Sequence, residues 1–304
     1  MKKIVFVFMM MLMVFSVAAC QGSNDEDRPT VVTTTTYIGD LVRNIGGPYI
    51  HVITLMDVGV DPHDYQPRQS DTNALQSADL VVINGFNLEE KMGEVIGNLP
   101  DASVIRLSDF VDEEKVLFEE AGVPDPHFWF DVMIWARLTE VIADALSDID
   151  ESNAERYQAR QIAYYQELHM LHQYIQRRVD ELPAEKRVLV TAHDAFAYFG
   201  AAYGFEVYAI QGISTQSEAS IRDIETLASL LVEKNIKSVF VETSVPEATV
   251  QALTEAAKAQ GHDARIAGSL YSDSTGGYAT GHETYIRTFL ANIDQIVDAL
   301  LDES

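Results

Sequence analysis

The sequence has one cysteine and few basic side chains. Its 304 residues include 21 lysines and arginines against 47 aspartates and glutamates, for a formal net charge of −26 at pH 7. Such a chain repels nucleic acid and attracts cations, so we expect no nucleic-acid partner. A lone cysteine forms no internal disulfide, and a free thiol outside the cell is open to oxidation, so this cysteine needs another use.

The motifs of several large enzyme classes are also missing. The sequence contains no Walker-type phosphate loop, no dinucleotide-binding fingerprint and no nucleophile elbow. His282-Glu283 lacks the second histidine of the zinc-protease motif. These absences remove the sequence signals for an ATPase, a dehydrogenase, a serine hydrolase and a zincin-type protease.

An apolar run at the N-terminus, Ile4–Val17, is shorter than the ~20 residues that a membrane-spanning helix needs. It follows two lysines and ends in small residues before the lone Cys20, which resembles a bacterial lipobox. We expect a signal peptide over residues 1–19, lipid attachment at Cys20, and a polar tether over residues 20–29. The alternative is a plain signal peptide that happens to precede a cysteine.

A long amphipathic segment, residues 153–182, divides the chain. It has no proline or glycine, and its apolar residues recur in steps of three and four on one helical face. These residues are Tyr164, Leu168, Leu171, Ile175, Val179 and Leu182. As a helix of about 30 residues it spans roughly 45 Å, which favours a strut between two lobes at residues 30–152 and 183–304. The alternative interpretation is an ordinary long amphipathic helix within a single domain.

Both flanks of this segment predict an α/β fold, in which strands alternate with helices and form mostly parallel sheets. The expected strands are Thr30–Tyr37, Tyr49–Leu55, Leu80–Asn84, Ser103–Leu107, Arg187–Thr191, Phe205–Ile210, Ser238–Glu242 and Ala264–Ile266. Expected helices include Leu88–Ile96, a helix that Ser70 caps, and a last helix over Glu283–Leu301. Two pseudo-symmetric lobes of this kind enclose a cleft, where ligands often bind.

Three histidines are expected near the carboxyl ends of strands, where ligands of open α/β sheets bind. His63 and His127 each end an Asp-Pro-His tripeptide, in which the proline restricts the backbone, and His193 directly follows a buried strand. Neutral imidazole is a common ligand of zinc. Asp273 and Glu242 are the candidates for an acidic fourth ligand.

The remaining histidines are weaker candidates. His169 and His172 are three residues apart on the long helix and are expected to form a surface pair. His51 lies within a strand, and His262 follows a helix.

Several motifs together resemble the metal-specific solute-binding proteins of ABC importers, the TroA-like cluster A-I family with its ZnuA-like members. The resemblance covers nearly all of the chain beyond the signal peptide. It rests on Gly59-Val60-Asp61-Pro62-His63-x-Tyr65-x-Pro67, Asp125-Pro126-His127-x-Trp129-x-Asp131, Thr191-Ala192-His193-Asp194-Ala195-Phe196-x-Tyr198-Phe199, Gly212-x-Ser214-Thr215-x-x-Glu218 and Leu270-Tyr271-Ser272-Asp273.

The resemblance implies a non-enzymatic, lipid-anchored monomer outside the cytoplasm. It places the metal ligands on His63, His127, His193 and Asp273, with one ion per chain. Zn²⁺ is the expected ion and Mn²⁺ the alternative. The implied partners are an ABC permease and, through it, a separate ATPase.

The chain departs from the family pattern at two points. Many zinc-specific members carry a histidine-rich loop before the second ligand, whereas residues 110–125 are acidic and hold no histidine. Many manganese-specific members have glutamate where this chain has His193.

Three other functions remain as alternatives. They are a zinc hydrolase with Glu242 as its general base, an adhesin-type lipoprotein with a structural metal, and a binder of an organic solute such as an iron chelate. Three histidines and one aspartate complete a four-coordinate site, which leaves no open position for a reactive water and disfavours the hydrolase.

Overall fold

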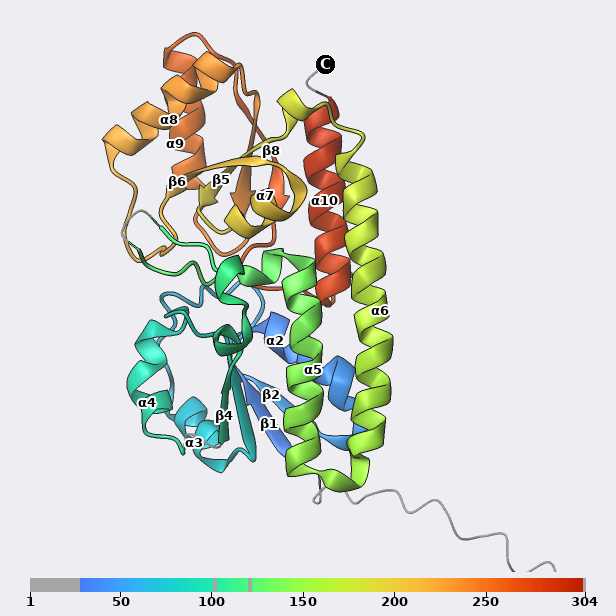
Figure 1. Ribbon diagram of the computed structural model, residues 1–304. Helices are drawn as coiled ribbons and strands as arrows, with labels where there is room; N and C mark the ends of the chain where they lie inside the picture. Colours follow the sequence, from blue (N-terminus) through green and yellow to red (C-terminus); the bar gives the residue numbers. More distant parts are fainter. Residues whose placement is uncertain (1–27, 101–102, 120–121, 303–304) are drawn as a thin grey trace, which may run out of the picture.

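The computed structural model describes residues 28–100, 103–119 and 122–302. The predicted signal peptide, Cys20 and nearly all of the tether lie outside these residues. Two α/β lobes lie along one side of a long helix, α6 (Ala154–Val179), as Figure 1 shows. The α/β fold with parallel sheets and one long connecting helix confirms the sequence prediction.

The N-terminal lobe contains a four-stranded parallel sheet in the order β2-β1-β3-β4. Its strands are β1 (Thr30–Thr33), β2 (His51–Thr54), β3 (Leu80–Ile83) and β4 (Val104–Arg106), each within a predicted segment. The central strands are rich in valine, and the four residues of β3 are all buried. Such runs are typical of parallel strands covered on both faces.

The helices of this lobe are α2 (Thr36–Gly46), α3 (Gln69–Ser77), α4 (Gly93–Gly97) and α5 (Val132–Ile149). Asp131 caps α5 as its carboxylate accepts the N–H groups of Met133 and Ile134. Turns of 3-10 helix lie between them at Gly47–Tyr49, Glu90–Met92, Leu107–Phe110, Glu113–Lys115 and Phe128–Phe130.

The C-terminal lobe pairs its strands in parallel as β5-β6 and β7-β8. The strands are β5 (Val188–His193), β6 (Glu206–Gln211), β7 (Ser238–Glu242) and β8 (Arg265–Leu270), and β5 also lies beside β7. The helices are α7 (Ala197–Tyr203), α8 (Ile221–Lys234), α9 (Ala248–Ala259) and α10 (Tyr285–Leu301). The carboxyl ends of β5 and β7 therefore meet at one edge, which positions the functional residues described below.

The connecting helix α6 buries the predicted apolar stripe, including Leu168, Leu171 and Ile175. The helix proper is shorter than the predicted 153–182, because it begins after a 3-10 turn at Glu151–Asn153 and ends at Val179, a few residues before Pro183. Helices α5 and α10 pack along α6 (Figure 1). Arg178 of α6 also pairs with two carboxylates of α10, Asp294 at 2.9 Å and Asp298 at 2.5 Å.

Two local predictions were wrong. Residues 88–96 do not form one helix, because the backbone of Glu89 is not helical (φ −95°, ψ 43°), and a 3-10 turn at Glu90–Met92 precedes the short α4, whose two glycines disfavour extension. Ser70 does not cap α3. The Asp71 carboxylate accepts the Arg68 N–H at 2.7 Å instead, so the helix begins at Gln69. The last helix also begins later than predicted, because Thr284 rather than an earlier residue caps it.

Within the described ranges, no helix is both long and apolar enough to cross a bilayer.

Asp40 on α2 is a buried carboxylate that joins three helices. Its Oδ2 accepts the Tyr164 hydroxyl of α6 at 3.2 Å and the Tyr285 N–H of α10 at 3.0 Å. Burial is the main cause that raises the pKa of Asp40 to about 6. Because this pKa lies above the unfolded value, folding favours the neutral form, and that contribution to stability is lost as the pH rises through about 6.

We therefore expect Asp40→Asn to raise the free energy of unfolding at neutral pH by up to about 3 kcal/mol. The amide keeps an acceptor for both donors but carries no charge to bury. Urea unfolding at about pH 7.5 should show this gain, and at about pH 4.5, where the unfolded chain still ionises Asp40, the gain should shrink to roughly a third. An equal gain at both pH values would show that the charge of Asp40 is not the cause.

Candidate metal centre

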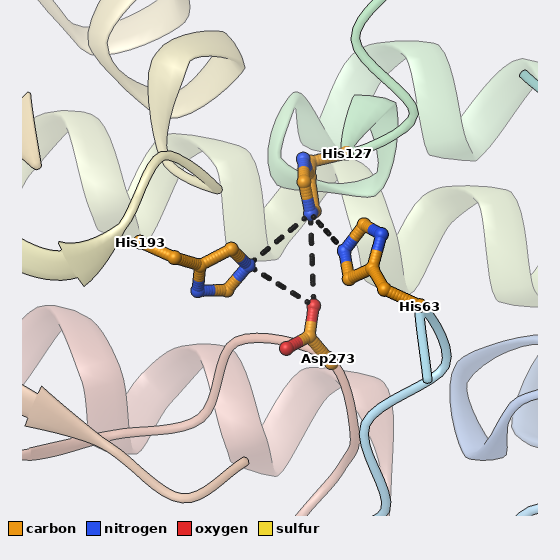
Figure 2. Close-up of side chains that lie close together, drawn as sticks. All are labelled: His63, His127, His193 and Asp273. Carbon is orange, nitrogen blue, oxygen red and sulfur yellow. Dashed lines mark hydrogen bonds and ion pairs between the residues drawn. The ribbon is translucent and has the colours of Figure 1, made fainter. Parts of the chain in front are cut away.

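Four side chains, those of His63, His127, His193 and Asp273, converge on one buried point (Figure 2). Each offers one donor atom, and these four atoms lie within 4.8 Å of one another. The exposed fractions of the four residues are 3%, 0%, 0% and 2% in the same order. This is the arrangement that the sequence predicts for the four candidate ligands.

The His127 imidazole lies at the centre of the group. Its Nε2 atom is 3.3 Å from the Nε2 of His63 and 3.4 Å from the Nε2 of His193. The Oδ1 atom of Asp273 lies 3.6 Å from the Nε2 of His127 and 3.5 Å from the Nε2 of His193. Donor atoms at these separations surround a space of the size of one metal ion.

Each lobe supplies two of these residues, all from loops or ends at the carboxyl side of strands. His63 lies in the loop between β2 and α3, and His127 precedes the 3-10 turn before α5. His193 is the last residue of β5, and Asp273 lies in the loop after β8. The site is therefore at the junction of the lobes, as expected for open α/β sheets.

The two Asp-Pro-His tripeptides form the same local turn. The carboxylate of Asp61 accepts the N–H of His63 at 2.9 Å, and that of Asp125 accepts the N–H of His127 at the same distance. Side-chain to backbone bonds of this kind are typical of aspartate two residues before the donor. Together with the intervening proline, these bonds restrain the backbone from which each histidine side chain extends. The sequence analysis missed this role of the two aspartates.

Two further carboxylates hold the outer nitrogens of two of the imidazoles. The Asp125 carboxylate is 2.7 Å from Nδ1 of His127, and the Glu242 carboxylate is 2.6 Å from Nδ1 of His193. Glu242, a candidate fourth ligand from the sequence, therefore lies behind His193 rather than among the four donors. Of the two acidic candidates from the sequence, Asp273 is the one that lies in the cluster.

The Asp273 carboxylate is oriented by two hydroxyl groups. Its Oδ2 accepts hydrogen bonds from Ser244 at 2.6 Å and from Ser272 at 3.3 Å. The other oxygen, Oδ1, faces the imidazoles of His127 and His193. The serines thus leave one carboxylate oxygen directed at the centre of the group.

Burial and mutual charge shift the pKa values of this group in opposite directions. Burial lowers the pKa of His63 to about 3. Burial by itself also lowers the pKa of His193, but the carboxylates of Glu242 and Asp273 outweigh it and hold this pKa well above its usual value. Burial raises the pKa of Asp273, yet the neighbouring imidazoles, His193 first, hold it far below its usual range. Asp273 is therefore a carboxylate at neutral pH.

The loop that carries His63 is held by residues of the opposite lobe. The Thr215 hydroxyl donates to the Asp61 carboxylate at 2.5 Å, and the Gln216 amide donates to the His63 carbonyl at 2.8 Å. The Gly59 N–H also donates to the Ser274 hydroxyl at 2.8 Å. These bonds close the two lobes over the site. Sequence reasoning missed the role of Gln216, and it found Thr215 only as a member of a family motif.

The other histidines have separate local partners. His172 contacts the Tyr203 hydroxyl at 3.0 Å, and His169 contacts the Gln173 amide at 3.1 Å on the same helix. His262 contacts a backbone carbonyl, His282 contacts the Tyr271 hydroxyl, and His51 is exposed in β2. Their separate places agree with the prediction that they are weaker candidates.

Comparisons with known proteins now decide the family. Residues 31–299 match the model of ZnuA, described as zinc-uptake complex component A, periplasmic. The chain belongs to this family. It is thus the metal-binding component of an ABC importer, works outside the cytoplasm, requires a membrane permease and is not an enzyme. Membership removes the hydrolase alternative and the reading as an adhesin or an organic-solute binder.

Individual members of the family are similar over almost the whole chain. The zinc-binding protein TroA of Treponema pallidum is 42% identical over 283 residues, which cover 92% of each chain. The manganese-binding lipoprotein MntA of Bacillus subtilis is 39% identical over 281 residues, again 92% of each. The solved structure of the Treponema protein superimposes with a TM-score of 0.88 and covers 90% of this chain and 99% of that one.

Proposed function

We propose that this member of the ZnuA family captures one divalent ion, Zn²⁺ in preference to Mn²⁺, through His63, His127, His193 and Asp273. The observation that carries the proposal is the convergence of four buried donor atoms within 4.8 Å of one another. The ion then passes to the permease, which a separate ATPase drives.

The donor set favours zinc. Zn²⁺ accepts imidazole well and forms four-coordinate tetrahedral sites, whereas Mn²⁺ is suited by carboxylate, carbonyl and water. Three imidazoles and one carboxylate match the ligands and coordination number that Zn²⁺ prefers. Manganese remains the alternative, because the second Asp273 oxygen, here held by Ser244 and Ser272, would raise the coordination number if it turned to the ion. The relatives also include both a zinc-binding and a manganese-binding protein.

We expect Zn²⁺ to displace Mn²⁺ from the wild-type protein at equal concentrations. His193→Glu should narrow this gap, since it replaces an imidazole by an oxygen ligand with negative charge. Competition calorimetry with both ions on both proteins measures the two affinities. His169→Glu, at an exposed position of α6, adds the same charge outside the site and should leave the gap unchanged.

Two results would contradict parts of this proposal. A wild-type protein that prefers manganese would overturn the choice of metal but leave the transport function in place. A His193→Glu protein with both affinities unchanged would remove His193 from the ligand set.

We further propose that Cys20 carries a lipid that holds the protein at the outer face of the membrane. The support is the lipobox-like sequence before this single cysteine and the lipoprotein description of relatives such as MntA of Bacillus subtilis. One acyl-anchored cysteine per chain is compatible with a monomer that diffuses along the membrane to its permease.

Replacing Cys20 by alanine should shift the protein from the membrane fraction to the soluble fraction. Metal binding should persist, because all four proposed ligands lie beyond residue 60. Fractionation after a high-salt wash, with immunoblotting, measures the distribution. Ser23→Ala, in the same segment, should stay with the membrane. A Cys20→Ala protein that remained bound after the wash would show that another anchor exists.

The domain boundaries are part of the same proposal. We assign the N-terminal lobe to residues 30–152, the connecting segment to 153–182 and the C-terminal lobe to 183–304. The support is that no sheet contains strands from both lobes and that α6 lies between the two sets of strands in the sequence.

A further inference from the structure

Glu242 is a buried glutamate at the last position of β7, and it is 3% exposed. Both of its carboxylate oxygens are directed at one residue. Oε1 accepts the backbone N–H of His193 at 2.8 Å, and Oε2 lies 2.6 Å from Nδ1 of the same histidine. The adjacent strands β5 and β7 produce this arrangement, because their carboxyl ends lie side by side.

The charge of Glu242 has one partner among the ion pairs of the described residues, and that partner is His193. Burying an unpaired carboxylate is costly, so a buried glutamate that served only to stabilise the strand end would need no charge there. A neutral glutamine of the same size would accept the backbone N–H equally well. The second oxygen of the Glu242 carboxyl group therefore serves the imidazole rather than the backbone.

A carboxylate accepts hydrogen bonds and donates none, so it selects the imidazole tautomer with its hydrogen on Nδ1. The lone pair of His193 is then on Nε2, which faces His127 and Asp273 at the centre of the site. An outer carboxylate also strengthens the imidazole as a metal donor. His63 differs, since the polar contact of its ring within the described residues is made through Nε2.

We propose that Glu242 is a positioning residue for metal capture, which acts through His193 by fixing its tautomer and the direction of its Nε2 lone pair. This inference rests on the proposed function, because it requires His193 to be a ligand. It assigns to Glu242 neither metal ligation nor general-base chemistry.

The first test is Glu242→Gln in the full-length protein. Its amide group forces either a mismatch at the backbone N–H or the wrong histidine tautomer, so zinc affinity should fall roughly 10- to 100-fold. Zinc calorimetry measures the affinity, and thermal unfolding of metal-free protein checks that the variant folds. Glu247→Gln, at an exposed position just before α9, is the matched control and should bind zinc as the wild type does.

A double-mutant cycle separates positioning from a general structural role. If Glu242 acts through His193, adding Glu242→Gln to a His193→Ala protein should cause no further loss of zinc affinity. A full additional loss in that background would overturn the proposal. If His193→Ala alone left zinc affinity unchanged, the proposed ligand set would fail instead, so the two failures are distinguishable.

A measurement on the wild-type protein needs no variant to fold. Nitrogen-15 NMR of the zinc-loaded protein should show His193 with a hydrogen on Nδ1 and with zinc bound at Nε2. Zinc bound at Nδ1, or a hydrogen on Nε2, would overturn the proposed action of Glu242.

Discussion

Zinc affinity is expected to fall more than about 100-fold when His127 is replaced by alanine, beyond the roughly 10- to 100-fold cost of losing an outer-sphere partner. His127 lies within contact distance of all three other donors, at 3.3, 3.4 and 3.6 Å from His63, His193 and Asp273. Because the site is closed to solvent, water does not readily replace the lost nitrogen. The three donors that remain are also less complementary to a tetrahedral ion.

Calorimetry and the metal content of protein purified without added metal measure this loss. His63→Ala should also lower zinc affinity. The double variant His63→Ala, His127→Ala should bind no zinc within the range of the method. His169→Ala and His172→Ala are matched controls, since both remove an imidazole from α6 outside the cluster. Wild-type affinity in the double variant would refute the ligand assignment.

Zinc affinity is also expected to fall steeply as the solution becomes acidic, and the fall should begin above the ordinary histidine pKa of ~6.5. His63 does not set this onset, because burial lowers its pKa to about 3 and keeps it neutral. His193 sets it, because burial is outweighed by Glu242 and Asp273, which hold its pKa well above the usual value. The metal-free protein therefore carries a proton on His193 that zinc must displace.

The direction of the pH dependence of zinc affinity follows from this proton on His193. Below the pKa of His193 in the metal-free protein, binding releases one proton, so affinity falls about tenfold for each pH unit of acidification. Above that pKa the affinity should level off. Calorimetry in two buffers with different heats of ionisation counts the protons released, and a titration from about pH 8 to about pH 5 gives the slope. An affinity that stayed flat across this range would contradict imidazole ligation.

Much of the architecture was predictable because its signals are local. The apolar stripe of α6 follows helical periodicity, and the strands are short runs of β-branched residues between turns. The two Asp-Pro-His tripeptides and His193 also identified three of the four clustered residues, since each histidine adjoins the end of a predicted strand. Residues 88–96 were predicted wrongly, because residue types compatible with a helix do not reveal the non-helical backbone of Glu89.

The choice between Asp273 and Glu242 is a different case. From the residue types alone, either acid was a possible fourth donor, and only the resemblance to a family favoured Asp273. In the fold, β7 lies beside β5, which directs the Glu242 carboxylate to the Nδ1 and N–H of His193, while the loop after β8 places Asp273 on the Nε2 side. The sequence by itself thus determined which residues carry metal-binding chemistry, because that property belongs to the side chain and its immediate neighbours. Which acid faces the cluster and which supports a histidine was decided only by the tertiary structure, because this depends on how strands distant in sequence are placed side by side.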